Sequence, residues 1–164
     1  MSSSYFPEFV KANSSAKLLF SMINRKPVTG DSSVGDKSNI HGTISFDKVQ
    51  FTYPQKQNQP VMTNLSFKAL PGQTVALVGP SGTGKSTIIS LVERFYDVCG
   101  GNLKIDGKDI KSFSLGHLRT QMALVGQEPR LFGFGSIKDN ICFGLTENVS
   151  DEKIQQALTL ANAQ

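Results

Sequence analysis

The sequence predicts an α/β fold for its 164 residues. Two segments, 43–51 and 64–70, alternate apolar and polar residues, which is typical of half-buried strands in an antiparallel sheet. A third segment, TVALVG at 74–79, is a short, continuous apolar run, as in a strand covered on both faces. It leads through a glycine-rich loop into helical apolar spacing at 86–96. The order strand, loop, helix indicates an α/β core with an antiparallel addition.

The N-terminal part is expected to be a helix followed by a linker. Apolar residues in 7–24 recur near a 3.6-residue period, which predicts an amphipathic helix within a helical segment 1–24. Residues 25–40 are rich in Pro, Gly, Ser, Asp and Lys, a composition that cannot bury a face and indicates a linker. The globular part is therefore expected over 41–164.

Further elements follow the glycine-rich loop. The segment at 101–107 predicts a short strand closed by an Asp106-Gly107 turn. MALVG at 122–126 predicts a second continuous apolar strand. Helices are expected at 115–121, 136–144 and 150–163, the last with Ser150 as its N-cap.

Composition excludes some classes of function. The net charge is +4, but the basic residues are scattered without a stripe or aromatic interleaving, so we expect no nucleic-acid binding. No apolar run approaches the ~18 residues of a membrane span, so we expect none in this chain. Cys99 and Cys142 follow no metal or disulfide spacing and predict buried, reduced thiols in a cytosolic compartment.

The glycine-rich loop predicts a phosphate-binding site. Gly79, Gly84, Lys85 and Ser86 satisfy the pattern G-x-x-x-x-G-K-S/T between a strand and a helix. Glycines let backbone N–H groups point inward, and the helix adds its positive end. The lysine supplies a charge for the β and γ phosphates, and the serine hydroxyl can ligate Mg²⁺. A glycine-rich turn with an exposed lysine is the alternative. The residues expected at this site are Gly79, Pro80, Ser81, Gly82, Thr83, Gly84, Lys85, Ser86 and Thr87, the last as a donor to the α phosphate.

Several stretches together resemble a known family. They are Tyr53-Pro54, NLSFKALPGQTVALVGPSGTGKST, LVERFYD, GGNLKIDGKDIKSF, Leu118-Arg119, ALVGQEPRLF and SIKDNICFG. Residues 43–164 thereby resemble the nucleotide-binding domain of ABC transporters, and most closely the multidrug exporters of the P-glycoprotein type, the B subfamily. The resemblance implies a P-loop NTPase with a RecA-like core and an antiparallel β subdomain, ending within the helical subdomain. It also implies that residues 1–24 are a connector from a membrane domain.

The resemblance assigns further residues to the site. Tyr53 matches the aromatic residue that stacks on adenine, and Val61 is expected near the same ring. Gln127 matches the glutamine that contacts Mg²⁺ and the attacking water. ATP and Mg²⁺ are thus the implied ligands, with Ser86 and Gln127 as metal ligands and Gln127 as the catalytic positioning residue. A strand-edge tyrosine and a surface glutamine are the alternatives that residue type alone leaves open.

The chain also departs from the family's pattern. Val98 replaces the proline of the usual F-Y-D-P turn, Arg130 stands at a commonly apolar position, and Gly133–Gly135 is one residue longer than usual. The signature motif, the Walker B strand, the catalytic base and the switch histidine are not among the 164 residues. We therefore expect the isolated chain to bind ATP without hydrolysing it, and the edges of its apolar strands to be exposed.

Function and partners follow as expectations from the resemblance. The chain is expected to be the ATP-binding part of an exporter that couples ATP hydrolysis to transmembrane transport. Its partners are then the exporter's membrane domains and an opposing nucleotide-binding domain, at the cytosolic face of a membrane, most naturally the plasma membrane; the isolated chain would be cytoplasmic. The alternative is a non-catalytic interaction or regulatory fragment that associates with a transporter. An unrelated P-loop kinase or GTPase is disfavoured by the surroundings of Tyr53 and Gln127.

Overall fold

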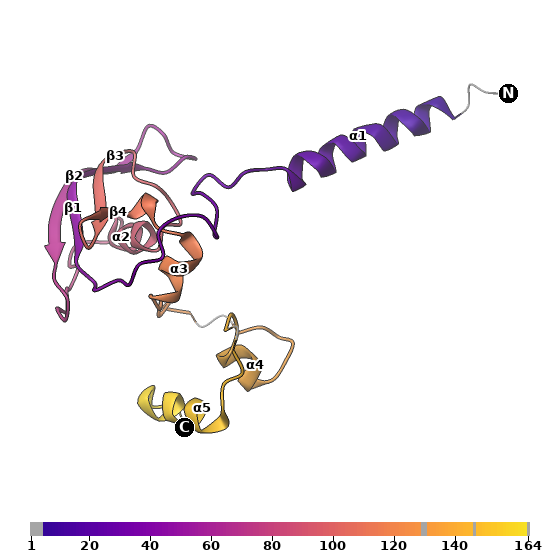
Figure 1. The fold of residues 1–164 in the computed structure, drawn as a ribbon. Helices are drawn as coiled ribbons and strands as arrows, with labels where there is room; N and C mark the ends of the chain where they lie inside the picture. Colours follow the sequence, from indigo (N-terminus) through magenta and orange to yellow (C-terminus); the bar gives the residue numbers. More distant parts are fainter. Residues whose placement is uncertain (1–4, 129–130, 146, 164) are drawn as a thin grey trace. The chain divides into compact units, whose positions relative to one another are not determined.

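The chain consists of two compact units in a computed structural model that describes residues 5–128, 131–145 and 147–163 (Figure 1). The first unit takes in residues 1–123 and the second residues 124–164. The first unit contains the sheet and the glycine-rich loop, and the second contains two short helices (Figure 1). The order of elements is that of a mixed α/β chain, as predicted.

The N-terminal helix forms where its apolar period predicts it. Helix α1 runs from Phe6 to Ile23, with Pro7 in its first turn, where a missing N–H costs nothing. None of its residues is buried, and its apolar side chains, such as Phe9 and Phe20, are exposed. No helix within the described residues is both long enough and apolar enough to cross a membrane.

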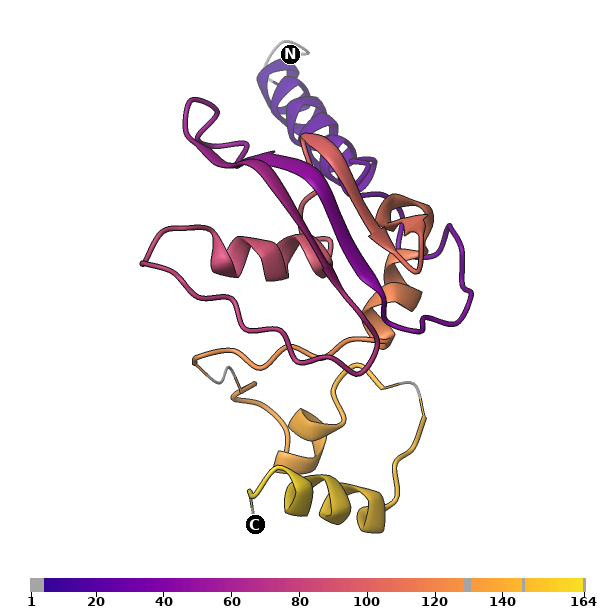
Figure 2. The same cartoon turned by 90° about the vertical axis from the view of Figure 1, so that its left-hand side faces the viewer.

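The sheet is antiparallel throughout. Its strands are β1 (Ile44–Thr52), β2 (Pro60–Ala69), β3 (Gly100–Ile105) and β4 (Lys108–Asp109), in the order β2-β1-β3-β4. Phe46 and Phe67 face each other across β1 and β2, with stacked rings whose centroids lie 4.6 Å apart. Both alternating segments are thus confirmed as paired strands, and Figure 2 shows them side by side.

A bulge in β1 decides which of its side chains reach the core. The register shifts between Phe46 and Val49 on the β2 side, and Lys48 adopts a positive φ of 48°. The extra residue lets Phe46 and Val49 both be buried, although strict alternation would put them on opposite faces. Gly101 of β3 lies against this bulge with φ 73°, and a Cβ there would lie 2.3 Å from the Lys48 carbonyl oxygen.

The turn after β3 anchors the chain that enters β1. Asp106 and Gly107 both have positive φ, 50° and 81°, as the predicted Asp-Gly turn requires. The Asp106 carboxylate accepts the backbone N–H of His41 at 2.6 Å and of Thr43 at 2.9 Å. Partial burial raises the pKa of the Asp106 carboxyl, but the hydrogen bonds from Thr43, His41 and Gly42 outweigh it and lower the pKa.

Part of the segment expected as a linker is hydrogen-bonded to the first unit. The Ser32 carbonyl accepts Ser114 Oγ at 2.8 Å, and the Asp36 backbone N–H donates to the Ser112 carbonyl at 2.8 Å. Lys108 Nζ donates to the Asp36 carboxylate. That ion pair, with the Ser38 backbone N–H, lowers the pKa of Asp36 to about 2. We call residues 32–43 the strap, because their polar groups fasten this segment to residues 106–117.

Helices on the sheet complete the core of the first unit. Helix α2 runs from Lys85 to Val92, the 3-10 helix η1 from Ile110 to Ser112, and helix α3 from Leu115 to Thr120. Figure 2 shows α2 beside the sheet. The buried cluster joins side chains from all these elements: Phe46, Val49, Phe51, Met62, Ile88, Leu91, Leu103, Ile105, Ile110, Phe113 and Leu118.

Two predicted strands are not formed. Segments 74–79 and 122–126 have no strand structure, and Val78 and Val125 are 92% and 94% exposed. A strand exists only through hydrogen bonds to a neighbour, and the described sheet consists of β1 to β4 alone. The parallel core expected from these runs is therefore absent from the described residues. The cysteines are free, but Cys99 is exposed, contrary to the predicted burial.

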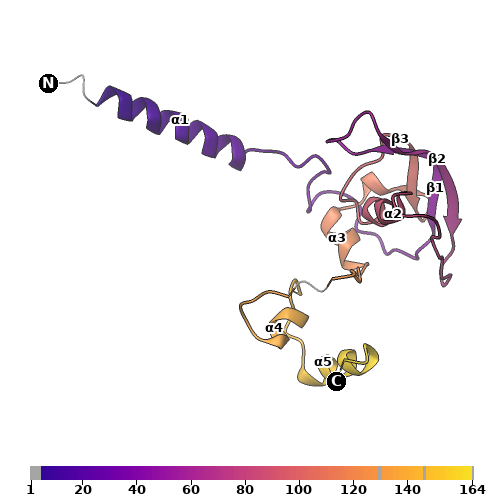
Figure 3. The ribbon, with the colours of Figure 1, turned by 180° about the vertical axis from the view of Figure 1, so that it is seen from behind.

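The second unit carries α4 (Ile137–Ile141) and α5 (Asp151–Leu160), both predicted (Figure 3). Ser136 and Asp139 form a capping box at the start of α4, with the Ser136 backbone N–H 2.7 Å from the Asp139 carboxylate. Ser150 is the N-cap residue of α5, as expected. The rings of Phe132 and Phe143 lie 4.2 Å apart between centroids.

Replacement of Gly101 by alanine should destabilise the first unit by at least about 3 kcal/mol, since a left-handed backbone cost adds to a clash with fixed backbone atoms. Gly107→Ala is the matched control, because φ is similarly positive at 81° but no atom lies within 4 Å of the added Cβ. We expect a cost of about 1–2 kcal/mol there. Urea unfolding measures both, and equal costs would contradict the bulge packing.

The ion pair of Asp36 should make stability depend on pH in the acid range. Because the folded pKa of about 2 lies below the reference value of 3.8, the contribution is present above the reference value and is lost as the pH falls through the folded value. Asp36→Asn should therefore be less stable than the parent chain at about pH 5 and approach it near pH 2. Urea unfolding at both pH values tests this. A difference that stays constant with pH would show that the charge of Asp36 contributes nothing.

Candidate phosphate-binding site

Two glycines in the loop before α2 adopt a left-handed backbone conformation. Gly82 and Gly84 have φ values of 85° and 84°, which other residues adopt only with strain. Gly84 is the N-cap of α2, and a Cβ on it would lie 2.8 Å from Val61 Cγ1 in β2. Glycine at 84 is thus needed both for the turn and for the close approach to β2.

Side chains of the loop bind its carbonyl groups. Lys85 Nζ donates to the carbonyl oxygens of Gly79 at 2.7 Å and Pro80 at 2.6 Å. Thr83 Oγ1 also donates to the Pro80 carbonyl, at 2.9 Å. The carbonyl oxygens are therefore occupied by donors from the same loop, and the lysine charge is held over the turn.

The N-terminus of α2 is suited to an anion. The first N–H groups of a helix have no acceptor within the helix, and Gly84 has no side chain to cap them. Their dipoles and the Lys85 ammonium bring positive potential to the same turn. Ser86, also in this turn, is exposed, so its hydroxyl is accessible to a bound cation. The residues present thus fit a phosphate chain with a divalent cation.

Tyr53, the first residue after β1, contacts the same helix turn. Its hydroxyl is hydrogen-bonded to Thr87 Oγ1 at 2.9 Å. Its ring packs edge to face on Phe51 and Tyr96, with centroid distances of 5.0 and 5.2 Å. Tyr53 and Val61 both pack against the core. The structure therefore brings together the predicted residues Tyr53, Val61, Gly84 and Thr87 around the start of α2.

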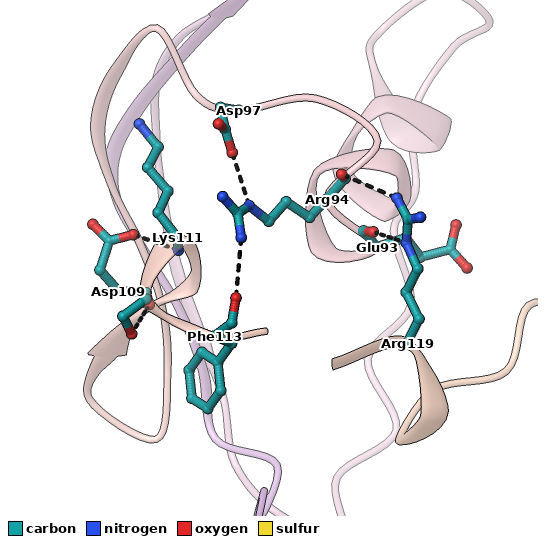
Figure 4. A network of polar contacts seen from close by, with 8 residues as sticks. Glu93, Arg94, Asp97, Asp109, Lys111, Phe113 and Arg119 are labelled. Atoms are coloured by element: carbon teal, nitrogen blue, oxygen red, sulfur yellow. Dashed lines mark hydrogen bonds and ion pairs between the residues drawn. The ribbon is translucent and has the colours of Figure 1, made fainter. Parts of the chain in front are cut away.

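Two arginines that the sequence reasoning did not assign to the site fix the other end of α2 (Figure 4). Arg119 donates from Nε to the Glu93 carbonyl at 3.1 Å and from Nη2 to the Arg94 carbonyl at 3.2 Å. Arg94 is 6% exposed, and its guanidinium donates to Asp97 Oδ1 at 3.1 Å and to the Phe113 carbonyl at 3.2 Å. Figure 4 shows the two guanidinium groups on either side of this chain segment. The sequence signals for them were the stretch LVERFYD, which contains Arg94, and the Leu118-Arg119 pair, both in the family resemblance.

Gln127 belongs to the second unit, and its side chain is exposed. Arg130, noted as a departure from the family, lies outside the described residues. Among the described residues there is no cluster of three or more His, Cys, Asp or Glu side chains that could hold a metal ion.

Comparison with known proteins decides the family. The model of the family described as ABC transporter matches residues 62–164, which include the loop, α2 and the second unit. This chain belongs to the ABC transporter family. Its ABC transporter segment begins within β2 and contains the whole phosphate loop.

The relatives of this ABC transporter chain are much longer than the chain itself. P-glycoprotein 14 of Caenorhabditis elegans is 62% identical over 162 residues, which is 99% of this chain and 12% of that protein. Multidrug resistance protein pgp-1 of C. elegans is 44% identical over 161 residues, 97% of this chain and 12% of that protein. Multidrug resistance protein 1 of Entamoeba histolytica is 45% identical over 161 residues, which is 96% of this chain and 12% of that protein. The chain is thus homologous to the ATP-binding part of such proteins and spans about 12% of their length.

Arg119→Ala should destabilise the first unit by about 1–2 kcal/mol, because it removes two charge-assisted hydrogen bonds and the contact of the guanidinium with the Phe95 ring, 4.8 Å from its centroid. Urea unfolding monitored by circular dichroism measures the change. Lys111→Ala, at an exposed position of η1 shown in Figure 4, is the matched loss of a basic side chain and should change stability by less than about 0.5 kcal/mol. Equal effects of the two substitutions would refute the role of Arg119 at the end of α2.

Proposed function

We propose that this chain binds ATP together with Mg²⁺ at residues 79–87. It is then the ATP-binding part of a longer ABC exporter. The observation that carries the proposal is the turn around Gly84, where Lys85 and the uncapped start of α2 supply positive charge and free N–H donors. The family match over residues 62–164 supports ATP as the source of the phosphates.

The site residues have distinct proposed tasks. Lys85 Nζ exchanges its carbonyl partners for β and γ phosphate oxygens, which are stronger acceptors because they are charged. Pro80, Ser81, Gly82 and Thr83 form the loop wall that surrounds the phosphates, between Gly79 and Gly84. Tyr53 offers its ring to adenine, with Val61 beside the loop.

The cation is proposed to be held by Ser86 and Gln127. A bound Mg²⁺ supplies charge neutralisation for the β and γ phosphates. The Ser86 hydroxyl ligates it from the first turn of α2, and the neutral amide of Gln127 can ligate a cation and orient a water molecule without titrating. Gln127 belongs to the second unit and is exposed, so its amide is accessible for this task.

The wider assignments rest on the longer relatives. We infer that the whole protein couples ATP hydrolysis to transmembrane transport, with membrane domains and an opposing nucleotide-binding domain as partners, at the cytosolic face of a membrane. In that arrangement residues 1–24 are a helical connector from a membrane domain, and residues 41–164 form part of the nucleotide-binding domain. Residues 25–40 link the two. The support is the similarity to P-glycoproteins and multidrug resistance proteins over nearly the whole chain.

Lys85→Ala should weaken Mg²⁺-dependent ATP binding by the purified chain at least about tenfold, since hydrogen bonds to charged groups contribute about 1.5–3 kcal/mol. Titration of a fluorescent ATP analogue, with and without Mg²⁺, measures this. Lys68→Ala, at an exposed position of β2, is the control for loss of one positive charge and should leave affinity unchanged. Equal affinity of the parent chain and Lys85→Ala, with both folded by circular dichroism, would disprove the proposed site.

A further inference from the structure

The hydroxyl of Thr87 lies in an unusual position for a helical threonine. Serine and threonine hydroxyls inside helices commonly donate to the carbonyl four residues earlier, as Ser90 Oγ of the same helix does to Ser86 at 3.1 Å. Thr87 lies in the first turn of α2 and instead bonds the Tyr53 hydroxyl at 2.9 Å. Its side chain is thus fixed by a residue 34 positions away in sequence.

The bond has a preferred direction. A phenol is a better hydrogen-bond donor than an aliphatic alcohol, and the alcohol oxygen is the better acceptor. When Tyr53 donates, the Thr87 oxygen keeps its own hydrogen to give. Among the described residues, the Thr87 side chain is hydrogen-bonded to Tyr53 alone, and Thr87 is only 5% exposed. A nearly buried donor is therefore left over at the first turn of α2, where the proposed phosphates bind.

The Tyr53 ring is fixed well enough to place its hydroxyl. Its edge-to-face contacts with Phe51 and Tyr96 leave it little rotational freedom, and Phe51 is 2% exposed. Tyr96 itself packs on Phe51 at 5.6 Å between centroids. The three rings form a packed cluster that fixes the Tyr53 hydroxyl relative to β1. The hydrogen bond from this hydroxyl to Thr87 then joins the cluster to the first turn of α2.

We propose that Tyr53 is a positioning residue for the phosphate loop: its hydroxyl donates to Thr87 Oγ1 and so directs the Thr87 hydrogen to the bound phosphates. The inference rests on the proposed ATP binding and adds a second task to the adenine contact of the ring. Chains of hydrogen bonds polarise one another, so the Thr87 hydrogen becomes a stronger donor while Tyr53 donates to its oxygen. The Tyr53 hydroxyl should then strengthen phosphate binding even for a ligand that has no base.

A ligand without a base separates the two tasks. Inorganic tripolyphosphate with Mg²⁺ has the phosphate chain of ATP but nothing to stack on a ring. Tyr53→Phe keeps the ring and removes the hydroxyl, and we expect it to weaken tripolyphosphate and ATP by the same factor, about three- to tenfold. Isothermal titration calorimetry on the full chain measures both. If Tyr53→Phe weakens neither ligand, weakens ATP alone, or tightens binding, the inference is overturned.

A double-mutant cycle shows whether the effect passes through Thr87. Thr87→Val should weaken tripolyphosphate at least as much as Tyr53→Phe, and adding Tyr53→Phe to Thr87→Val should change affinity by less than about twofold. Thr87→Ser keeps the hydroxyl, so in that background Tyr53→Phe should again weaken tripolyphosphate binding. Additive losses in the double mutant would refute the positioning role. The same cycle in urea unfolding without ligand should show non-additivity from the hydroxyl pair itself.

Two controls separate this inference from the proposed function. Tyr96→Phe removes a hydroxyl from the neighbouring ring of the same cluster and should leave both affinities unchanged. Lys85→Ala reports on the phosphate site itself. Binding that depends on Lys85 but not on the Tyr53 hydroxyl refutes the positioning role alone, whereas binding independent of Lys85 refutes the proposed site and the positioning role together.

Discussion

The anchoring of α2 at both ends is the constraint on which the candidate site depends. A helix of eight residues is not stable in isolation, so its position comes from tertiary contacts. Ile88 and Leu91 bury its inner face, and Tyr53 bonds its first turn. Arg119 bonds the carbonyl groups of the two residues that directly follow the helix. These contacts fix the first turn of α2, and with it the N–H groups that begin the helix. The phosphate binding that we propose therefore depends on the packing of the first unit as well as on the loop.

Features set by local chemistry could be predicted from the sequence. The glycines of 79–84 predicted a loop in which the backbone turns sharply, and Gly82 and Gly84 have positive φ in the structure. The alternation at 43–51 and the Asp106-Gly107 pair predicted a paired strand and a tight turn, and both are present. The sequence signal for each of these lies within a few residues, which is the range over which residue pattern carries information.

Features set by distant partners could not be predicted. The apolar runs at 74–79 and 122–126 have the composition of buried strands, but strand formation requires a hydrogen-bonding neighbour, and composition does not supply one. The bulge at Lys48 is fixed by the contact of two strands far apart in sequence. Arg94 and Arg119 donate hydrogen bonds to backbone carbonyl groups. Every residue has such a group, so the sequence does not show which carbonyl an arginine will bind. The Arg94–Asp97 pair also closes the turn in which Val98 replaces the family's usual proline.

The strap determines the order in which the first unit can be completed. Strands β1 and β2 are joined by the short loop 53–59, so their pairing closes little chain and can begin early. The strap bonds join residues much farther apart, 63 positions for Thr43 and Asp106 and 82 for Ser32 and Ser114. During synthesis, residues 32–43 therefore leave the ribosome well before their partners exist. The connection from α1 into the sheet becomes fixed only after α3 has been made, although it lies near the beginning of the chain.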